Sequence, residues 1–417
     1  MSQPVSQIKK GTLLSCAFLI AGDCIGAGFI GVPVMTGPAG FWPATLITLI
    51  TGLYVVAGGL LYLEAIQIHP DGANITSICR RHLGIFGTYL GAITLILMNY
   101  YFLGAFINVG ARFLEGYSTQ IWNYTPSYPL LTFLCATLFG GIILIGTYVT
   151  DRVNFILFVG LLATLLITIF GKGVQVKVEN LQQESWYLVF FAVPLLLAAF
   201  NCQTILPTVF SHYKERRNPK KVRALLLVGL SIPFVVYLAW QWVVIGSTPI
   251  SWLWRAYEVG IPTREGISLG ELFADYYPSK KNMLLIQKSF HLTTFFAAVT
   301  SLLVLGIATV DFFADLFRIP VEKRDGRKRI PLFLLTILPP TLISFQFPLL
   351  FGNLFNGIIG TCIIVFLGII PLWLVIQIRY LEKIPTIPLL PGGKGTLWVF
   401  GILTFFLFYL EGVALIQ

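Results

Sequence analysis

Charged side chains are scarce in this sequence. Only 11% of its 417 residues are Asp, Glu, Lys or Arg, against roughly 25% in ordinary soluble proteins. With 56% hydrophobic residues and a mean hydropathy of +0.83, so few charges could not cover the surface of a soluble globule. This composition excludes a soluble enzyme, a disordered tail and a nucleic-acid binder. It predicts an all-α integral membrane protein with one polytopic domain over residues 1–417.

Sequence motifs for metals, disulfides and nucleotides are also lacking. The six cysteines form no CxxC pair and no Cys/His cluster, and the four histidines show neither metal-ligand spacing nor a catalytic pairing. No GxxxxGK[ST] sequence occurs, which argues against an ATP-driven pump. We therefore expect no cofactor, no metal site and no enzymatic activity.

Long apolar stretches are what the sequence has in abundance. About eleven of them reach the roughly 20 residues that a spanning helix needs. They are predicted at Thr12–Met35, Phe41–Ala65, Thr88–Gly110, Tyr128–Tyr148, Val153–Phe170, Trp186–Phe210, Val222–Gly246, Phe290–Leu316, Ile330–Phe347, Asn353–Ile378 and Thr396–Ile416. An odd number of spans places the two termini on opposite sides of the membrane.

Basic residues are distributed unevenly between the predicted loops. With the N-terminus in the cytoplasm, about 20 of the 28 Lys and Arg residues fall on the cytoplasmic side. This bias obeys the positive-inside rule and predicts a cytoplasmic N-terminus and an external C-terminus. The net charge of +10 is therefore explained by topology and contact with lipid head groups.

Two predicted spans carry helix breakers at matching positions. Four glycines and a proline occur in the first span between Gly22 and Pro33, and the sixth span has a polar centre followed by Pro207. Such breaks survive in a membrane only beside a cavity, because unpaired backbone groups are costly in lipid. Since the breaks are five spans apart, we expect two inverted five-helix repeats, 1–171 and 186–378, with an extra helix at 396–416.

The ends of broken helices suit a zwitterionic ligand. An exposed half-helix N-terminus attracts an anion, exposed carbonyl groups attract a cation, and an α-amino acid carries both charges close together. The alternative, that the glycines only allow close helix packing, remains open. The substrate-binding candidates lie in the two breaks and on the third span: Asp23, Cys24, Gly26, Ala27, Gly28, Tyr100, Tyr101, Phe200, Asn201, Cys202 and Gln203.

Several motifs resemble those of the hydroxy/aromatic amino acid permeases, the family of bacterial tyrosine and tryptophan permeases. The motifs are Ile25-Gly26-Ala27-Gly28 with Pro33, Ile232–Gln241 with Ile245-Gly246-Ser247, Asp311–Phe317, and Leu338-Pro339-Pro340. The resemblance covers essentially the whole chain. It implies a LeuT-like fold and import of tyrosine or tryptophan across the bacterial inner membrane, driven by the proton-motive force. The chain departs from the family pattern at Asp23, Asn201 and Gln203.

Asp23 is the leading candidate for ion coupling. A carboxylate at mid-membrane costs about 2.5–3.5 kcal/mol, and desolvation favours its protonated form. Asp23 could carry the coupled proton, pair with the substrate ammonium, or serve as a hydrogen-bonded packing residue. Further coupling or gating candidates are Glu64, Asp311 and Asp315 near the inner face, and Thr300 and Ser301, which resemble the hydroxyls of a sodium site.

The sequence therefore predicts a secondary active importer of aromatic amino acids that works by proton symport with alternating access. A sodium-coupled or uncoupled amino acid carrier of another specificity is the main alternative. A channel would not need paired broken helices, and a non-transporting sensor would bind its ligand without accumulating it. No nucleic-acid partner is expected.

Overall fold

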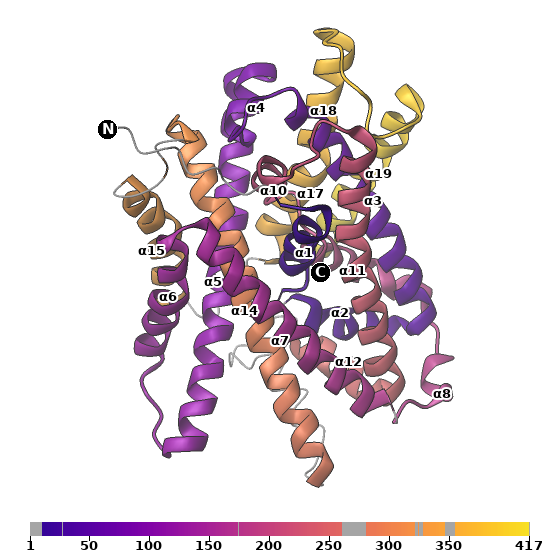
Figure 1. The fold of residues 1–417 in the computed structure, drawn as a ribbon. Helices are drawn as coiled ribbons and strands as arrows, with labels where there is room; N and C mark the ends of the chain where they lie inside the picture. The colour runs from indigo at the N-terminus through magenta and orange to yellow at the C-terminus, as the bar shows by residue number, and fades with distance from the viewer. Residues whose placement is uncertain are drawn as a thin grey trace.

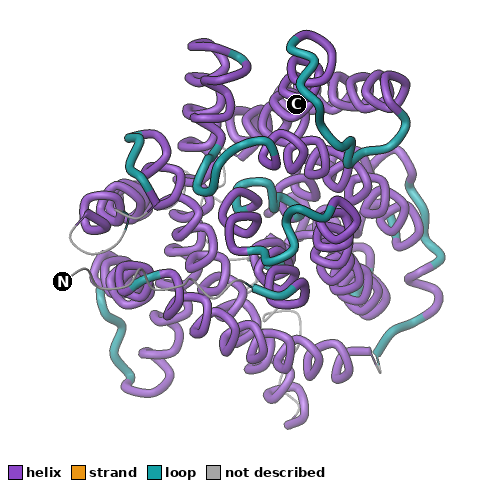
Figure 2. Tube along the Cα trace, turned by 45° about the horizontal axis from the view of Figure 1, so that its top comes forward, coloured by secondary structure: helices purple, strands orange, loops and turns teal. Residues whose placement is uncertain are grey.

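The structure is a computed structural model, and it describes residues 11–26, 28–173, 175–260, 281–321, 324, 328–346 and 355–416. In this part of the chain the backbone is helical, apart from loops and one isolated bridge between Gly11 and Tyr213 (Figure 2). The candidate Ala27 lies outside the described residues.

The helices of the first half of the chain follow the predicted order (Figure 1). They are α1 (Leu13–Cys24), α2 (Gly28–Thr36), η1 (Gly37–Ala39), α3 (Phe41–Gln67), α4 (Ile75–His82), α5 (Gly84–Trp122), α6 (Tyr128–Ile145), α7 (Thr147–Gly173) and α8 (Val178–Leu181).

The second half, like the first, consists mainly of long helices and contains one interrupted helical segment. Its elements are η2 (Trp186–Ala192), α9 (Val193–Ala199), α10 (Leu206–His212), α11 (Pro219–Ser247), α12 (Ile250–Gly260), α14 (Lys281–Leu316), α15 (Arg329–Gln346), η5 (Phe355–Ile359), α17 (Gly360–Ile364), η6 (Val365–Ile369), α18 (Ile370–Ile376), η7 (Gln377–Leu381) and α19 (Gly393–Ile416). The run from η5 to η7 is one continuous helical segment with three π-helical stretches, and we call it the tenth segment.

Nine helices of the described chain are long and apolar enough to cross a membrane. A tenth crossing is the pair α1 and α2, whose axes differ by 58° at the first break. The remaining predicted span, Trp186–Phe210, is divided into η2, α9 and α10, each of which is too short to cross a membrane by itself. The prediction of an all-helical membrane protein is confirmed, with both predicted interruptions present.

Helix α14 lies at the centre of the bundle, where it contacts α1, α5, α6 and α7. In the most apolar 18-residue stretch of its span Lys288–Leu316, 83% is buried, whereas the corresponding stretch of α19 is only 22% buried. Helix α14 therefore forms an internal scaffold, and α19 lies at the periphery with most of its surface available to lipid.

Glycine allows the tenth segment to approach α3 closely. A Cβ atom at Gly58 would lie 2.3 Å from the Leu367 carbonyl oxygen and 2.7 Å from Nε2 of Gln203. Backbone contact at this distance leaves no room for any side chain. The same approach brings the second break and the tenth segment into contact.

Candidate functional site

The two helix breaks meet at the hydroxyl group of Tyr237 on α11. Its oxygen lies 2.5 Å from the Cys24 carbonyl, at the end of α1, and 2.8 Å from the Ala199 carbonyl, at the end of α9. Tyr237 is fully buried. Because its hydroxyl group has only one proton, that proton is shared between the two carbonyl groups. The negative ends of two half-helices therefore converge on a single donor.

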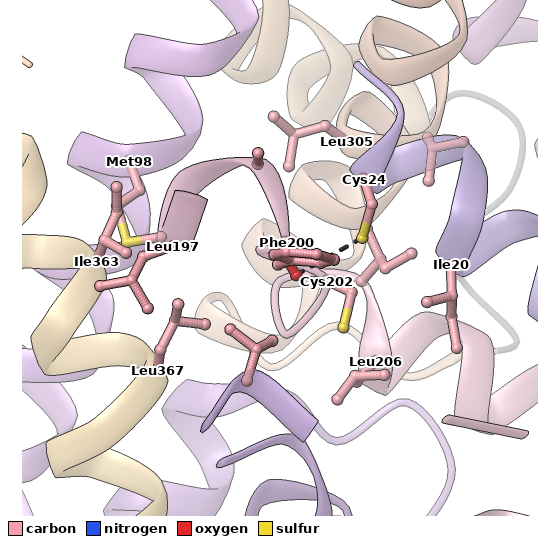
Figure 3. Close-up of a cluster of buried hydrophobic side chains, with 14 of the residues drawn as sticks. Ile20, Cys24, Met98, Leu197, Phe200, Cys202, Leu206, Leu305, Ile363 and Leu367 are labelled. Atoms are coloured by element: carbon pink, nitrogen blue, oxygen red, sulfur yellow. Dashed lines mark hydrogen bonds between the residues drawn. The ribbon is translucent and has the colours of Figure 1, made fainter. Parts of the chain in front are cut away.

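A second contact joins the breaks directly. The Cys24 thiol donates a hydrogen bond to the Phe200 carbonyl at 3.6 Å, and both side chains are buried (Figure 3). Cys202 is fully buried beside them, and its side chain interacts with the Cys24 thiol. Residues 176 positions apart in sequence thus lie in one site, as predicted for Cys24, Phe200 and Cys202.

Ser301 on α14 holds the first break from the scaffold side. Its hydroxyl lies 3.2 Å from the Gly22 carbonyl and 3.3 Å from the Asp23 carbonyl. A Cβ atom at Gly26 would lie only 2.6 Å from the Ser301 oxygen, so glycine is needed for this approach. The neighbouring Thr300 hydroxyl instead donates within α14, to the Phe296 carbonyl at 2.8 Å.

Asp23 lies among these groups with one carboxyl oxygen unpaired. Its Oδ2 atom is buried and has no hydrogen-bond partner among the described residues. A charged carboxylate without a partner is costly in such a place, which favours either a bound proton or a cationic ligand. Gly28 begins α2 beyond the break, and a Cβ atom there would meet nothing within 4 Å.

The second break is held by its own side chains. The Phe200 ring packs 4.8 Å from the Tyr237 ring and faces Gly52 on α3. Gln203 donates from Nε2 to the Leu367 carbonyl at 3.2 Å and so anchors the break to the tenth segment. The side-chain carbonyl oxygens of Asn201 and Gln203 are buried without a partner among the described residues.

Apolar side chains surround this polar centre. In Figure 3 four of them lie on the side of Phe200 away from Cys24, while Ile20, Leu206 and Leu305 lie on the Cys24 side. The four come from α5, α9 and the tenth segment and form an apolar wall: Met98, Leu197, Ile363 and Leu367. Apolar walls with a few convergent polar groups are typical of sites for small amphipathic ligands.

The two tyrosines predicted on the third span lie on α5. The Tyr100 hydroxyl donates to the Leu335 carbonyl of α15 at 2.7 Å, so its tip is engaged by the scaffold. The Tyr101 ring packs edge-on against Phe102 at 5.3 Å. Contact of either residue with a ligand stays a prediction.

The carboxylates predicted for gating lie at the end of the molecule that carries α4. Asp311 accepts a hydrogen bond from Thr208 of α10 at 2.8 Å and faces Arg324 at 3.8 Å. Asp315 accepts from the Thr76 hydroxyl and from the Ser77 amide at the start of α4. Asp311 therefore links α14 to α10, beside the second break, and Asp315 links α14 to α4.

Glu64 is engaged differently. It forms a bidentate ion pair with Arg379, with both N–O distances at 2.6 Å, and also accepts from Thr386 and from the Leu389 amide. All of its lone pairs are directed at donors, so Glu64 acts as an anchor between α3, the tenth segment and the connection to α19.

A small cavity of about 20 Å³ opens beside the breaks at the α4 end. It is bordered by α1, α7, α10 and α14. Its polar side chains are Thr150, Asp151, Asn154, Thr208 and His212. The sequence reasoning missed Asp151 because the fifth span was predicted to start at Val153, and it gave Asn154, inside that span, no role. Their spacing of three residues, on one helix face, is the signal that could have found them.

Two interrupted helices inside a helical scaffold are typical of the LeuT-like fold. The fold matches a crystal structure of MhsT in complex with L-phenylalanine with a TM-score of 0.64, covering 96% of this chain and 98% of that one, at 14% identity. Residues 9–409 match the Tryptophan/tyrosine permease family, and the chain belongs to this family.

Relatives of known name agree with this membership. A tryptophan-specific transport protein of Haemophilus influenzae is 25% identical over 354 residues, covering 82% of each chain. The tyrosine-specific transport system 1 of the same species is 26% identical over 334 residues, covering 79% of each chain. The low affinity tryptophan permease of Escherichia coli is 25% identical over 395 residues, covering 90% of this chain and 89% of that one. The protein is thus a multi-pass membrane transport protein and not an enzyme.

Proposed function

We propose that this protein imports tryptophan, tyrosine or both across the bacterial inner membrane, by proton symport with alternating access. The observation that carries the proposal is the convergence of two carbonyl helix ends on Tyr237 beside an apolar wall. The names of its relatives support an aromatic substrate.

The geometry suggests how an amino acid would bind. Its ammonium group would take the place of a protein hydroxyl at the carbonyl ends of α1 and α9, which Tyr237 and Ser301 now satisfy. Its carboxylate would face the start of α2 near Gly28. Its ring would lie along the apolar wall, and the unpaired side-chain oxygens of Asn201 and Gln203 could accept from an indole N–H or a phenol O–H.

We further propose that α1 and α10 move against α5, α7 and α14 to open the site to either side. The predicted repeats 1–171 and 186–378, the extra helix 396–416, the cytoplasmic N-terminus and the periplasmic C-terminus belong to this proposal. The Asp311 contacts with Thr208 and Arg324 would then close the cytoplasmic side, because they bridge α10 and the scaffold.

Uptake by proteoliposomes tests the function. Purified protein is reconstituted, and radiolabelled tryptophan and tyrosine are offered under an imposed pH gradient, with and without sodium. We expect saturable accumulation above equilibrium without sodium, abolished by a protonophore. Accumulation only with sodium would replace the proton by sodium, and Ser301 would then be the first residue to examine. No uptake of either amino acid would refute the proposed substrate.

Asp23 is the proposed proton-carrying group at the site. Asp23→Asn should abolish accumulation driven by a pH gradient and leave exchange of substrate across the membrane, because the amide keeps the size and loses the proton. The measurement compares gradient-driven uptake with counterflow in the same liposomes. Unchanged accumulation would exclude the proton role of Asp23.

A further inference from the structure

The cavity at the α4 end contains a carboxyl group to which the site described above gives no task. Asp151 of α7 borders the cavity together with Thr208 and His212 of α10. Its carboxyl group forms no hydrogen bond or ion pair within the described parts of the chain, whereas Asp311 nearby is held by Thr208 and Arg324. A carboxyl group that faces a cavity without a fixed partner is able to gain and lose a proton.

Asn154 connects this carboxyl group with the first break. It lies one helical turn from Asp151 on the same face of α7, and both residues border the cavity. Its Nδ2 atom would be 3.7 Å from a Cβ atom at Gly22, the residue before Asp23. Its Oδ1 atom is buried and has no hydrogen-bond partner among the described residues. Asn154 therefore lies between the cavity and the backbone of the first break at Gly22.

The charged and titratable groups around Asp151 come from three neighbouring elements. Cys16 faces it from α1, His212 from α10 and Asp311 from α14. His212 is a basic group beside the Asp151 carboxyl group, and Asp311 is a second acidic group.

We propose that Asp151, positioned by Asn154, is the inner relay of the transport cycle: it takes the coupled proton from Asp23 and releases it through the cavity to the cytoplasm. The O–H bond of the Asp23 carboxyl group breaks, an O–H bond forms on the Asp151 carboxylate, and the proton then passes to cytoplasmic water. In this proposal, water that enters beside Asn154 as α1 moves carries the proton between the two carboxyl groups. This inference rests on the proton symport proposed above.

The relay would couple the proton to the motion of the helices. The cavity lies between α1 and α10, which carry the ends of the broken spans, and α7 and α14, which form the scaffold. A state in which α1 and α10 close onto α7 would separate Asp151 from the cytoplasm. Release of the proton would then be possible only in the state that also releases the substrate inward.

Proteoliposomes carrying Asp151→Asn test the relay with two assays. Counterflow of tryptophan reports binding and the movement between inward and outward states, and needs no net proton transfer. Accumulation under a pH gradient reports coupling. We expect Asp151→Asn to keep counterflow within about twofold of the unaltered protein and to lose accumulation down to the equilibrium level. The control is Glu115→Gln, since Glu115 pairs with Arg112 on α5 outside the cavity, and it should accumulate normally.

Each outcome decides between the two proposals. Unaltered protein that transports neither tryptophan nor tyrosine contradicts the proposed function, whatever Asp151 does. Normal accumulation by Asp151→Asn overturns the relay alone. If Asp151→Asn also loses counterflow, Asp151→Glu is measured. Recovery of pH-driven accumulation then supports a proton-carrying carboxyl group, and failure of counterflow in both variants assigns Asp151 to folding or binding and overturns the relay.

Discussion

The first and the second helix break differ in how their backbone groups are held. The first break is rich in glycine, and neighbouring helices approach its backbone: Ser301 reaches the Gly22 and Asp23 carbonyls because Gly26 has no side chain. The second break carries larger side chains that reach outward, as Gln203 does to the Leu367 carbonyl. We therefore expect added side-chain atoms to disrupt the first break, and the removal of side-chain atoms to disrupt the second.

The largest effect is expected at Tyr237, which serves both breaks. Tyr237→Phe leaves the carbonyls of Cys24 and Ala199 buried without their donor. An unsatisfied buried group costs about 1–3 kcal/mol, so transport should fall by about tenfold or more. Tyr54→Phe is the matched control, because it loses one buried hydroxyl contact, with Thr404 of α19, and no contact with a carbonyl at a helix break. Equal rates for both variants would mean that the shared donor is dispensable.

Gly26→Ala tests the first break alone. The added methyl group would overlap the Ser301 hydroxyl, and we expect about a tenfold loss of tryptophan uptake at unchanged expression. The double variant Gly26→Ala/Ser301→Ala should recover part of the loss, because the overlapping oxygen is gone. Gly141→Ala on α6 serves as the control, since its Cβ atom would meet nothing within 4 Å. Absence of any recovery would show that Gly26 is needed for its backbone conformation.

Phe200→Ala tests the second break by removal. Loss of the buried ring leaves a gap beside Tyr237 and Gly52, and aromatic substrates should lose affinity by about three- to tenfold more than small amino acids. Competition of unlabelled amino acids against labelled tryptophan measures the difference. An equal loss for aromatic and small substrates would assign Phe200 to packing rather than to recognition.

The smallest effect is expected outside both breaks, at His69 between α3 and α4. Burial lowers its pKa from the usual 6.5, and the neighbouring His82 and Arg81 contribute to the shift. The unfolded chain therefore binds a proton at His69 more readily than the folded chain does. The stability contributed by neutral His69 is complete above pH 6.5, and it declines as the pH falls through the lowered pKa of the folded state. His69→Gln should reduce the drop in Tm between pH 7.5 and pH 5.5 by about 1–2 °C. An unchanged drop would mean that other groups dominate the acid sensitivity.

The spans and the breaks could be predicted because their signals are local. Hydropathy marks the membrane-embedded stretch, and glycine and proline mark the interruptions near Gly26 and Pro207. Helix ends were less predictable: α5 runs from Gly84 to Trp122 because the helix continues beyond its apolar part. The structure brings Cys24, Phe200 and Cys202 together as predicted.

The partners of these residues could not be predicted, because they depend on long-range packing. Tyr237 belongs to a recognisable motif, but its contact with Cys24 spans 213 residues and no local pattern indicates it. The Tyr100 hydroxyl is directed to α15, which helix periodicity alone could not show. Asp151 was placed in a loop, since hydropathy favours a later start for α7.

The pairing of Glu64 with Arg379 also has a consequence for biosynthesis. The two residues are 315 positions apart, so the ribosome delivers the acidic group long before its basic partner. During that interval α3 must keep Glu64 at the membrane surface, because an unpaired charge resists entry into lipid. The final packing of α3 therefore has to wait until the tenth segment has left the translocon. Truncation before Arg379 should leave a protein that cellular quality control removes.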